Sequence, residues 1–325
     1  MPGFTTHYIL GMKAYNDLPN NQLKYIVAKY RWLYQLGLQG PDMFFYNIPI
    51  LRHRDYRNVG SYMHEHKVNA FFECCLRRIG TIRSRQQQEE AISYLAGFIN
   101  HYIADSICHP YVYGRIGYPV DAPTSMHHGM HAHLENELDA ILLWKYKKKK
   151  PSEFNQTATI CLNGQEIQFI SHFLASCINE TYYPITYRNN FQVTPAMVHR
   201  SIWALRFGCR TLSDKNGKKK FGIAQVESIF VNHPVASAKM VTDSVTDYRS
   251  SCNLNHEAWG NPWDPTRVST ASFVDLFHET LDKCSRVYAL LNSAVTDNMP
   301  LDKQDLSPLL AELGNESYHS GLPVE

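Results

Sequence analysis

The feature that most constrains this chain is the stretch from Phe98 to Tyr113, whose sequence is FINHYIADSICHPYVY. If the stretch is helical, His101, Asp105 and His109 lie along one face, because each is turned by roughly 40° from the one before. Neutral imidazole and carboxylate groups are preferred ligands of zinc and related divalent metals. The stretch therefore predicts one wall of a metal site, although a wet surface stripe or a buried Asp–His pair would use the same residues.

Composition indicates an ordinary globular protein. The chain has 325 residues, of which 44% are hydrophobic and 19% are charged, and its net charge is +2. This balance gives no reason to expect nucleic acid as a partner. The eight cysteines form no CxxC pair, so we expect reduced thiols in the core. Cys108 lies in the histidine-rich stretch, but its direction on the helix is about 60° from that of Asp105, which makes it a poor ligand candidate.

The sequence predicts no membrane-spanning segment and no export signal. Its N-terminus lacks the basic start, long apolar run and small-residue cleavage site of a signal peptide. No window approaches 18 uninterrupted apolar residues, and no stretch has the pattern of an amphipathic surface anchor. We therefore expect a cytoplasmic protein.

The apolar spacing predicts an all-α fold, a multi-helix bundle with at most one small β-hairpin. Helices are expected at residues 4–16, 25–36, 60–80, 87–113, 127–147, 168–182, 195–213 and 269–292. Pro110 should kink or close the fourth of these helices. The Asn-Gly pair within TATICLNGQEIQFI is typical of a hairpin turn.

We expect one domain, residues 1–313, in which residues 1–147 bind metal and residues 148–313 shape the pocket. Residues 314–325 should form a flexible tail.

Further candidate ligands lie on both sides of the central stretch. His131 and Glu135 are four residues apart on the next predicted helix, while His7, Asp42 and His64 come earlier in the chain. Together with the central stretch these residues suffice for two metal ions, or three. Metal pairs ~3.5–4 Å apart are a recurring device for displacement at phosphorus.

Two carboxylates have natural roles in such a site. Asp105, centred between two histidines, is suited to bridge the metals, and Asp42 could orient the attacking water or accept its proton.

Five motifs, THY, GPD, MH, HYIADSICHP and HAHLENELD, follow one another in this order along the first half of the chain. In that order on an all-helical chain, they resemble the zinc-dependent phospholipase C family. The wider group also includes secreted bacterial phospholipases C and single-strand-specific nucleases of the P1 type. The resemblance covers roughly residues 1–145.

The resemblance implies a set of zinc ligands and a fold of the phospholipase C and P1 nuclease type. One zinc ion would be surrounded by Asp42, His64, His101 and Asp105, and a second would be held by His109, His131 and Glu135. Asp105 would bridge from the first ion toward a third ion bound by His7, and Asp42 would act as the general base.

Two departures from the family pattern leave alternatives open. In the secreted enzymes the amine of an N-terminal tryptophan joins the ligands, whereas this chain begins Met-Pro. The family histidine that follows HxxxD lies six residues past the Asp, whereas His109 lies four past Asp105. Alternative ligands are His66, His127, His128 and His133, the last of which pairs with Glu137 at the same spacing as His131 with Glu135.

The predicted function is zinc-dependent hydrolysis of a phosphoric ester, with a small phosphate ester or a phospholipid headgroup as substrate. A P1-type nuclease is the first alternative; Phe44, Phe45 and Tyr46 would then stack on bases, although the near-neutral charge argues against nucleic acid. A metal-stabilised binding protein without turnover is the second. Phe44 and Tyr46, with Trp259 from an aromatic loop, are the predicted substrate contacts.

Overall fold

The fold is described from a computed structural model of the chain. The structure describes residues 3–46, 59–182, 192–212, 214, 218–230, 237, 240–243, 245 and 247–325. Within these residues the fold is helical apart from one two-stranded sheet, which confirms the predicted all-α class. In the same part of the chain, no helix is both long enough and apolar enough to cross a bilayer.

The N-terminal half contains the elements that surround the histidine-rich stretch. They are α1 (Phe4–Asp17), α2 (Gln22–Lys29), α3 (Arg31–Gly37), the 3-10 helix η1 (Gly40–Tyr46), α5 (Val59–Glu65), α6 (Val68–Thr81), α7 (Arg85–Arg115) and α8 (Ser125–Lys147).

The C-terminal half adds the outer helices and the hairpin. Its elements are η2 (Pro151–Glu153), η3 (Gln156–Thr159), α9 (Gly164–Thr181), α11 (Pro195–Leu212), α12 (Lys218–Phe230), α13 (Tyr248–Ser251), β1 (Trp259–Asn261), β2 (Asp264–Ser269), α14 (Phe273–Thr296) and α15 (Ser307–Leu313).

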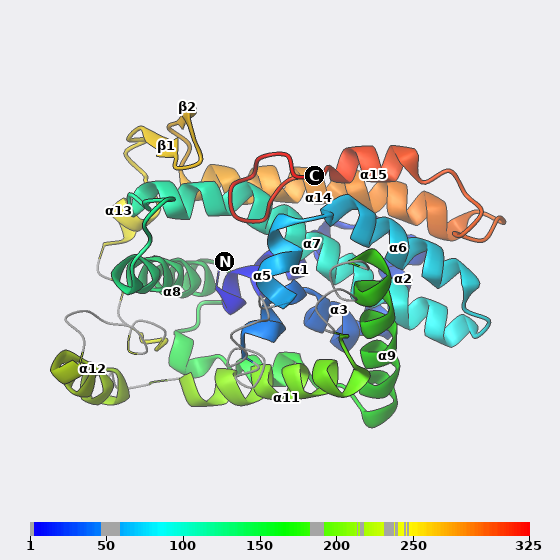
Figure 1. The fold of residues 1–325 in the computed structure, drawn as a ribbon, viewed down its shortest axis with the longest axis horizontal. Coiled ribbons are helices and arrows are strands. Elements are labelled where there is room, and N and C mark those ends of the chain that lie inside the picture. Colours follow the sequence, from blue (N-terminus) through cyan, green and yellow to red (C-terminus); the bar gives the residue numbers. More distant parts are fainter. Residues whose placement is uncertain are drawn as a thin grey trace.

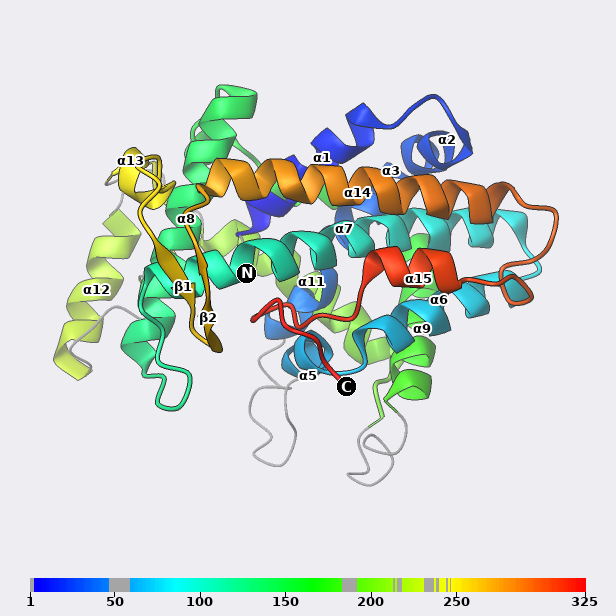
Figure 2. The same cartoon turned by 90° about the horizontal axis from the view of Figure 1, so that it is seen from above.

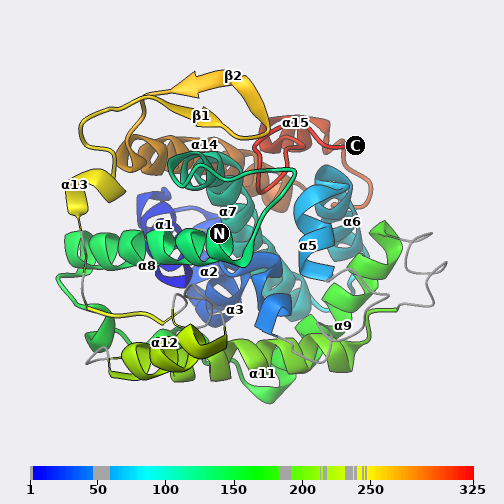
Figure 3. The same cartoon turned by 60° about the vertical axis from the view of Figure 1, so that its left-hand side comes forward.

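The long helix α7 runs through the middle of the molecule and contacts most of the other elements (Figures 1 and 2). Its N-terminus is capped by Ser84, whose hydroxyl accepts a hydrogen bond from the amide of Gln87. Helix α14 lies beside α7 on one side, and α11 lies along the opposite edge (Figures 1 and 3). Because almost every residue of α7 between Glu89 and Val112 is buried, polar side chains within that span must find partners inside the protein.

Two glycines bring α3 against α7 and thereby place η1 beside the histidine-rich stretch. A Cβ added at Gly97 would lie 2.1 Å from the carbonyl oxygen of Tyr34, and one added at Gly37 would lie 2.1 Å from that of Tyr94. The backbones of the two helices therefore touch, which no larger residue would permit.

Two of the predicted helices are each interrupted by a short break. The helix expected at residues 25–36 divides into α2 and α3 at Tyr30, and the one expected at 60–80 divides into α5 and α6 near Lys67. Lys67 adopts a left-handed φ of 49°, which ends α5 and lets α6 start in a new direction.

The predicted hairpin at the Asn-Gly pair is wrong. Asn163 instead caps α9: its side chain accepts a hydrogen bond from the amide of Glu166, whose carboxylate accepts one from the amide of Asn163. The described hairpin is formed by β1 and β2, in the aromatic loop, with an irregular register after Gly260.

Pro110 does not close α7, which continues to Arg115. Proline removes the hydrogen bond that Ser106 would otherwise accept within the helix. The last segment of the chain packs there, because a Cβ added at Gly321 would lie 2.5 Å from the carbonyl oxygen of Ser106.

The predicted flexible tail is also wrong: residues 315–325, here called the C-terminal segment, pack onto the protein. Tyr318 is 1% exposed in the main hydrophobic core. The backbone of Asn315 accepts a hydrogen bond from Val324, so the segment closes on itself. Lys67 donates its amide proton to the carbonyl of Glu325, which ties the chain end to α6. The reason is that the segment buries a large aromatic side chain, which a solvated tail would leave exposed.

Candidate metal centre

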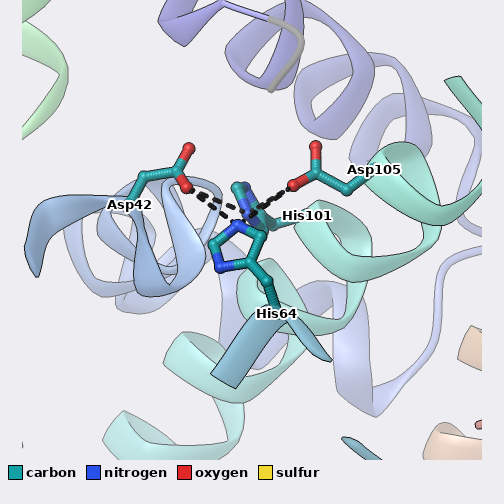
Figure 4. Close-up of side chains that lie close together, drawn as sticks. All are labelled: Asp42, His64, His101 and Asp105. Atoms are coloured by element: carbon teal, nitrogen blue, oxygen red, sulfur yellow. Dashed lines mark ion pairs between the residues drawn. The ribbon is translucent and has the colours of Figure 1, made fainter. Parts of the chain in front are cut away.

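Four of the predicted ligands converge at one point between η1, α5 and α7. Each offers one ligand atom, and these atoms all lie within 4.8 Å of one another; they belong to Asp42, His64, His101 and Asp105 (Figure 4). Asp42 comes from η1, His64 from α5, and the other two from α7. All four side chains are at least 96% buried, so the group is a desolvated site and not a wet surface stripe.

Backbone carbonyls set the orientation of three histidines. Nδ1 of His64 donates to the carbonyl of Gly60 at 2.6 Å, and Nδ1 of His101 donates to that of Leu38 at 3.1 Å. His109 makes the equivalent bond at 2.6 Å to a carbonyl of the C-terminal segment. A carbonyl can only accept, so each ring carries a proton on Nδ1, and Nε2 is the atom through which it could bind a metal, as is usual for histidine ligands.

Asp105 lies between His7 and the other ligands of this group. Its Oδ1 is 3.1 Å from Nε2 of His7, and its Oδ2 is 3.1 Å from Nε2 of His101. Burial raises the pKa of Asp105, but the neighbouring His101 and His7 outweigh this effect and hold that pKa well below its usual range. Asp105 is therefore an ionised, buried carboxylate that faces two sets of ring nitrogens, the position required of a bridging ligand.

The remaining charges of the group are distributed unevenly. Burial lowers the pKa of His64, but the nearby carboxylates of Asp105 and Asp42 outweigh burial and raise it to about 9. Burial and the neighbouring His101 lower the pKa of His7. Without a metal, the ring of His64 therefore holds the proton that compensates the two carboxylates.

A second set, His109, His131 and Glu135, also brings its ligand atoms within 4.8 Å of one another. Oε1 of Glu135 lies 2.6 Å from Nε2 of His131 and 3.6 Å from Nε2 of His109. Burial lowers the pKa of His131 well below its usual value and raises that of Glu135 to about 7. His109 reaches this set although it lies only four residues past Asp105, because it stays on the same face of α7.

The alternative histidines, His66, His127, His128 and His133, belong to neither group. Nε2 of His133 is 3.6 Å from Glu137, but the side chain of His133 is 50% exposed, and Glu137 accepts a hydrogen bond from Ser251. His127 instead caps α8, where its Nδ1 accepts a hydrogen bond from the amide of Thr124. The geometry therefore favours the pair His131 and Glu135 over the pair His133 and Glu137.

The chemistry of the first group fits a divalent cation. Among the described residues, several buried atoms that face the group have no partner with hydrogen-bond geometry, although they lie within ion-pair distance of one another. These atoms are Nε2 of His7, Oδ1 of Asp42, Nε2 of His64, Nε2 of His101 and both oxygens of Asp105. Buried polar atoms normally have partners. A metal ion bound by nitrogen and oxygen would supply the partner that these atoms lack.

The C-terminal segment contributes contacts that the sequence did not predict. The carbonyl of Tyr318 accepts the hydrogen bond from His109, and its amide donates to the carbonyl of His64 at 2.9 Å. His319 stacks on the ring of His64, with centroids 4.9 Å apart, and lies 5.7 Å from that of His109. The segment thus joins the two metal groups. The only sequence signal was an aromatic–histidine pair near the chain end, and such a pair does not by itself indicate a metal site.

A further residue outside the predicted site positions His7. The carboxylate of Asp139, on α8, accepts hydrogen bonds from the amides of Thr5 and Thr6 at 3.0 and 2.8 Å and from the hydroxyl of Thr6 at 2.7 Å. These groups form the first turn of α1, so Asp139 acts as an N-terminal cap from a distant helix. It holds α1 where His7 meets Asp105.

The predicted substrate contacts do not gather at the metal groups. Phe44 is 1% exposed in the core, and the ring of Tyr46 packs against Gly208 of α11. Trp259 is 9% exposed and donates its indole N–H to the carbonyl of Ala271, so it is a packing anchor. Trp263, at the turn of the hairpin, instead contacts the ring of Tyr113, which lies 4.5 Å from that of His131. The aromatic residue nearest the second group therefore comes from α7.

Comparison with known protein families agrees with this geometry. The family model described as zinc dependent phospholipase C matches residues 6–186, more than half of the chain. The match includes all eight predicted ligands and ends well before the C-terminal segment. No curated protein and no solved structure matches the chain significantly.

Proposed function

Because the chain belongs to the zinc-dependent phospholipase C family, we propose that it hydrolyses the phosphodiester of a phospholipid headgroup. The observation that carries the proposal is the position of Asp105, an ionised carboxylate buried at the meeting point of His7, His101 and the second metal group. Such a carboxylate sets the separation of paired metal ions, the arrangement used for displacement at phosphorus.

The two groups differ in which residues would hold zinc. In the first, the proposed ligands are Asp42, His64, His101 and Asp105; in the second, they are His109, His131 and Glu135. His7 is the side chain available to a third ion, because its Nε2 faces Asp105 and its ring nitrogens have no partner with hydrogen-bond geometry among the described residues. Metal content decides between two and three ions.

The protein's own residues would place the reacting groups. When bound, zinc supplies Lewis acidity, which lowers the pKa of a water molecule and polarises the phosphoryl group. Asp42 would orient the attacking water and accept its proton, since Oδ1 of Asp42 faces the group without a hydrogen-bond partner. The carbonyls that bind Nδ1 of His64 and His101 would keep both rings in register, so that little reorganisation is needed as charge develops.

Metal content and turnover of one protein preparation test the proposal together. We expect two or three zinc ions per chain and release of a phosphorylated headgroup from phosphatidylcholine vesicles. His101→Ala should lose the zinc of the first group and the turnover. The matched control is His133→Gln, which removes a histidine that is half exposed and outside both groups. A protein without stoichiometric zinc would refute the proposal. Hydrolysis of single-stranded DNA by the wild type, but not by His101→Ala, would replace it with a nuclease.

A further inference from the structure

Helix α11 lies on the side of the molecule opposite α14 (Figures 1 and 3). It carries a pair of exposed aromatic side chains. Trp203 is 62% exposed and Phe207 is 54% exposed. Their rings stack on each other with centroids 5.3 Å apart and planes inclined by 9°. Large aromatic side chains are rarely left this exposed without a partner to cover them, and two of them together form a contiguous apolar patch.

Arginines flank the pair along the same stripe of the helix. Arg200 and Arg210 are both exposed, and with Trp203 and Phe207 they fall within about 80° of the helix circumference. The buried side chains of α11 lie on the opposite face; they are Val198, Ser201, Ile202, Leu205 and Cys209. Helix α11 therefore has a buried face that packs on the core and an outer face that combines aromatic and cationic groups. The outer face has no carboxylate.

The net charge of α11 and the start of α12 differs sharply from that of the rest of the chain. Residues 192–222 contain seven Lys or Arg and a single acidic residue, a net charge of +6, whereas the whole chain carries +2 and the remainder therefore −4. The single acid, Asp214, is buried and accepts a hydrogen bond from the amide of Lys220. Helix α12, which follows, exposes Lys218, Lys219 and Phe221 in its first turn. The aromatic and cationic character thus extends over two helices.

We propose that the outer face of α11, with the first turn of α12, docks the protein on an anionic lipid surface. Trp and Phe would enter the interface between headgroups and acyl chains, where amphipathic rings are favoured, while the arginines and lysines would meet the negative surface potential. The same combination of aromatic and basic residues is typical of helices that lie in the membrane plane. The sequence alone predicted no such anchor, because it does not show that Trp203 and Phe207 are exposed. The identification of lipid as the partner rests on the proposed function.

Charge argues against the main alternative occupant. A second copy of this chain, docked by the same face about a two-fold axis, would bring two surfaces of high positive charge together. Single-stranded nucleic acid is also anionic, but the parallel packing of Trp203 against Phe207 covers one face of each ring, which leaves less ring surface on which bases could stack.

The docking face touches the proposed site through one element. Helix α11 packs against η1, which carries Asp42, and the ring of Tyr46 at the end of η1 contacts Gly208. Docking would therefore hold the protein at the lipid surface by a helix that also supports one wall of the first metal group.

Vesicle sedimentation tests the inference without reference to catalysis. Wild-type protein should sediment with vesicles of phosphatidylglycerol and phosphatidylcholine in equal amounts, and much less with phosphatidylcholine alone. The double variant Trp203→Ala/Phe207→Ala should bind the anionic vesicles at least about tenfold more weakly, because it loses two apolar rings. Arg200→Ala/Arg210→Ala should show a similar loss and a weaker dependence on salt.

Tyr25→Ala is the matched control, since Tyr25 is an aromatic residue of α2 with 59% exposure. It should bind as the wild type does. Equal vesicle binding by wild type and Trp203→Ala/Phe207→Ala would overturn the inference, as would no binding by the wild type. Loss of single-stranded DNA binding or of a concentration-dependent dimer in the variant, without vesicle binding by the wild type, would assign the face to that partner instead.

Kinetics separate this inference from the proposed function. Trp203→Ala/Phe207→Ala should lose activity on vesicles but keep the wild-type kcat on a soluble short-chain phospholipid. A wild-type protein that binds vesicles and hydrolyses neither substrate refutes the proposed hydrolysis alone. One that hydrolyses both substrates without binding vesicles refutes the docking face alone.

Discussion

Gly40 is the position at which one added methyl group should damage the metal centre most selectively. It begins η1 with a φ of +45°, and a Cβ there would lie 2.2 Å from Cδ2 of His101. Non-bonded carbon atoms prefer separations of about 3.5–4.0 Å, so Gly40→Ala must push the ring and η1 apart by more than about 1 Å. The ring is buried, and its Nδ1 donates to the carbonyl of Leu38, so it cannot turn aside without breaking that bond.

The magnitude follows from two separable costs. A left-handed backbone costs a residue other than glycine about 1–2 kcal/mol, and overpacking a rigid interior costs about 1–3 kcal/mol. Gly117 supplies the control, because it has a φ of +61° but no atom within 4 Å of an added Cβ. Gly117→Ala should therefore lose only the stability that corresponds to the backbone cost. Gly40→Ala should lose the sum of both costs, about 2–5 kcal/mol.

The assay compares unfolding by urea and zinc content in the two variants. Gly117→Ala should keep the wild-type zinc content. Gly40→Ala should be less stable than Gly117→Ala and lose about one zinc ion per chain, because separating η1 from α7 moves Asp42 away from His101. If both variants have the same stability and zinc content, the close approach of Gly40 to His101 does not constrain the site, and the reasoning is wrong.

Four further predictions concern the ligands and their supports. Zinc binding to chelator-stripped protein at pH 7.5 should release about one proton, because His64, with a pKa of about 9, must lose its proton to bind metal. Calorimetry in two buffers of different ionisation enthalpy measures the number of protons released. A release of less than about 0.3 proton per ion would contradict the prediction. The raised pKa of His64 also stabilises the metal-free protein below about pH 6.5, and this contribution of about 3 kcal/mol should vanish as the pH rises through about 9, as measured by urea unfolding. Deletion of residues 315–325 should weaken zinc binding at the second group by about 10–100-fold in a chelator competition, since His109 loses its carbonyl partner, whereas Tyr318→Phe keeps that carbonyl and should bind normally. Asp105→Asn should lower zinc to about one ion per chain by mass spectrometry, because His109, His131 and Glu135 keep the second group, and unchanged zinc would show that Asp105 bridges nothing.

The metal groups could be predicted because several of their ligands recur at the four-residue spacing of a helix face. His101, Asp105 and His109 recur every fourth residue on a helix that the structure confirms, and His131 with Glu135 repeats that spacing on α8. Side chains that carry the chemistry are visible in a sequence, and helical spacing states which of them share a face.

Elements that depend on competing local signals were harder to predict. Asn163 and Gly164 match a hairpin turn, but Glu166 three residues later completes a capping box, and that signal determined the structure. Trp259 and Trp263 lie in one loop, and the sequence does not state which of them is buried. Their roles followed only when β1 paired with β2 and buried Trp259 against Tyr111.

The support of the metal centre is the part that no side-chain pattern could reveal. His64, His101 and His109 are oriented by carbonyl oxygens, and every residue type has such an oxygen, so the sequence of residues 315–325 carries no mark of its contact with His109. One of the three carbonyls, that of Tyr318, also lies outside the residues that the family model matches. A change in the C-terminal segment can therefore alter the second metal group while every ligand in the family pattern stays in place.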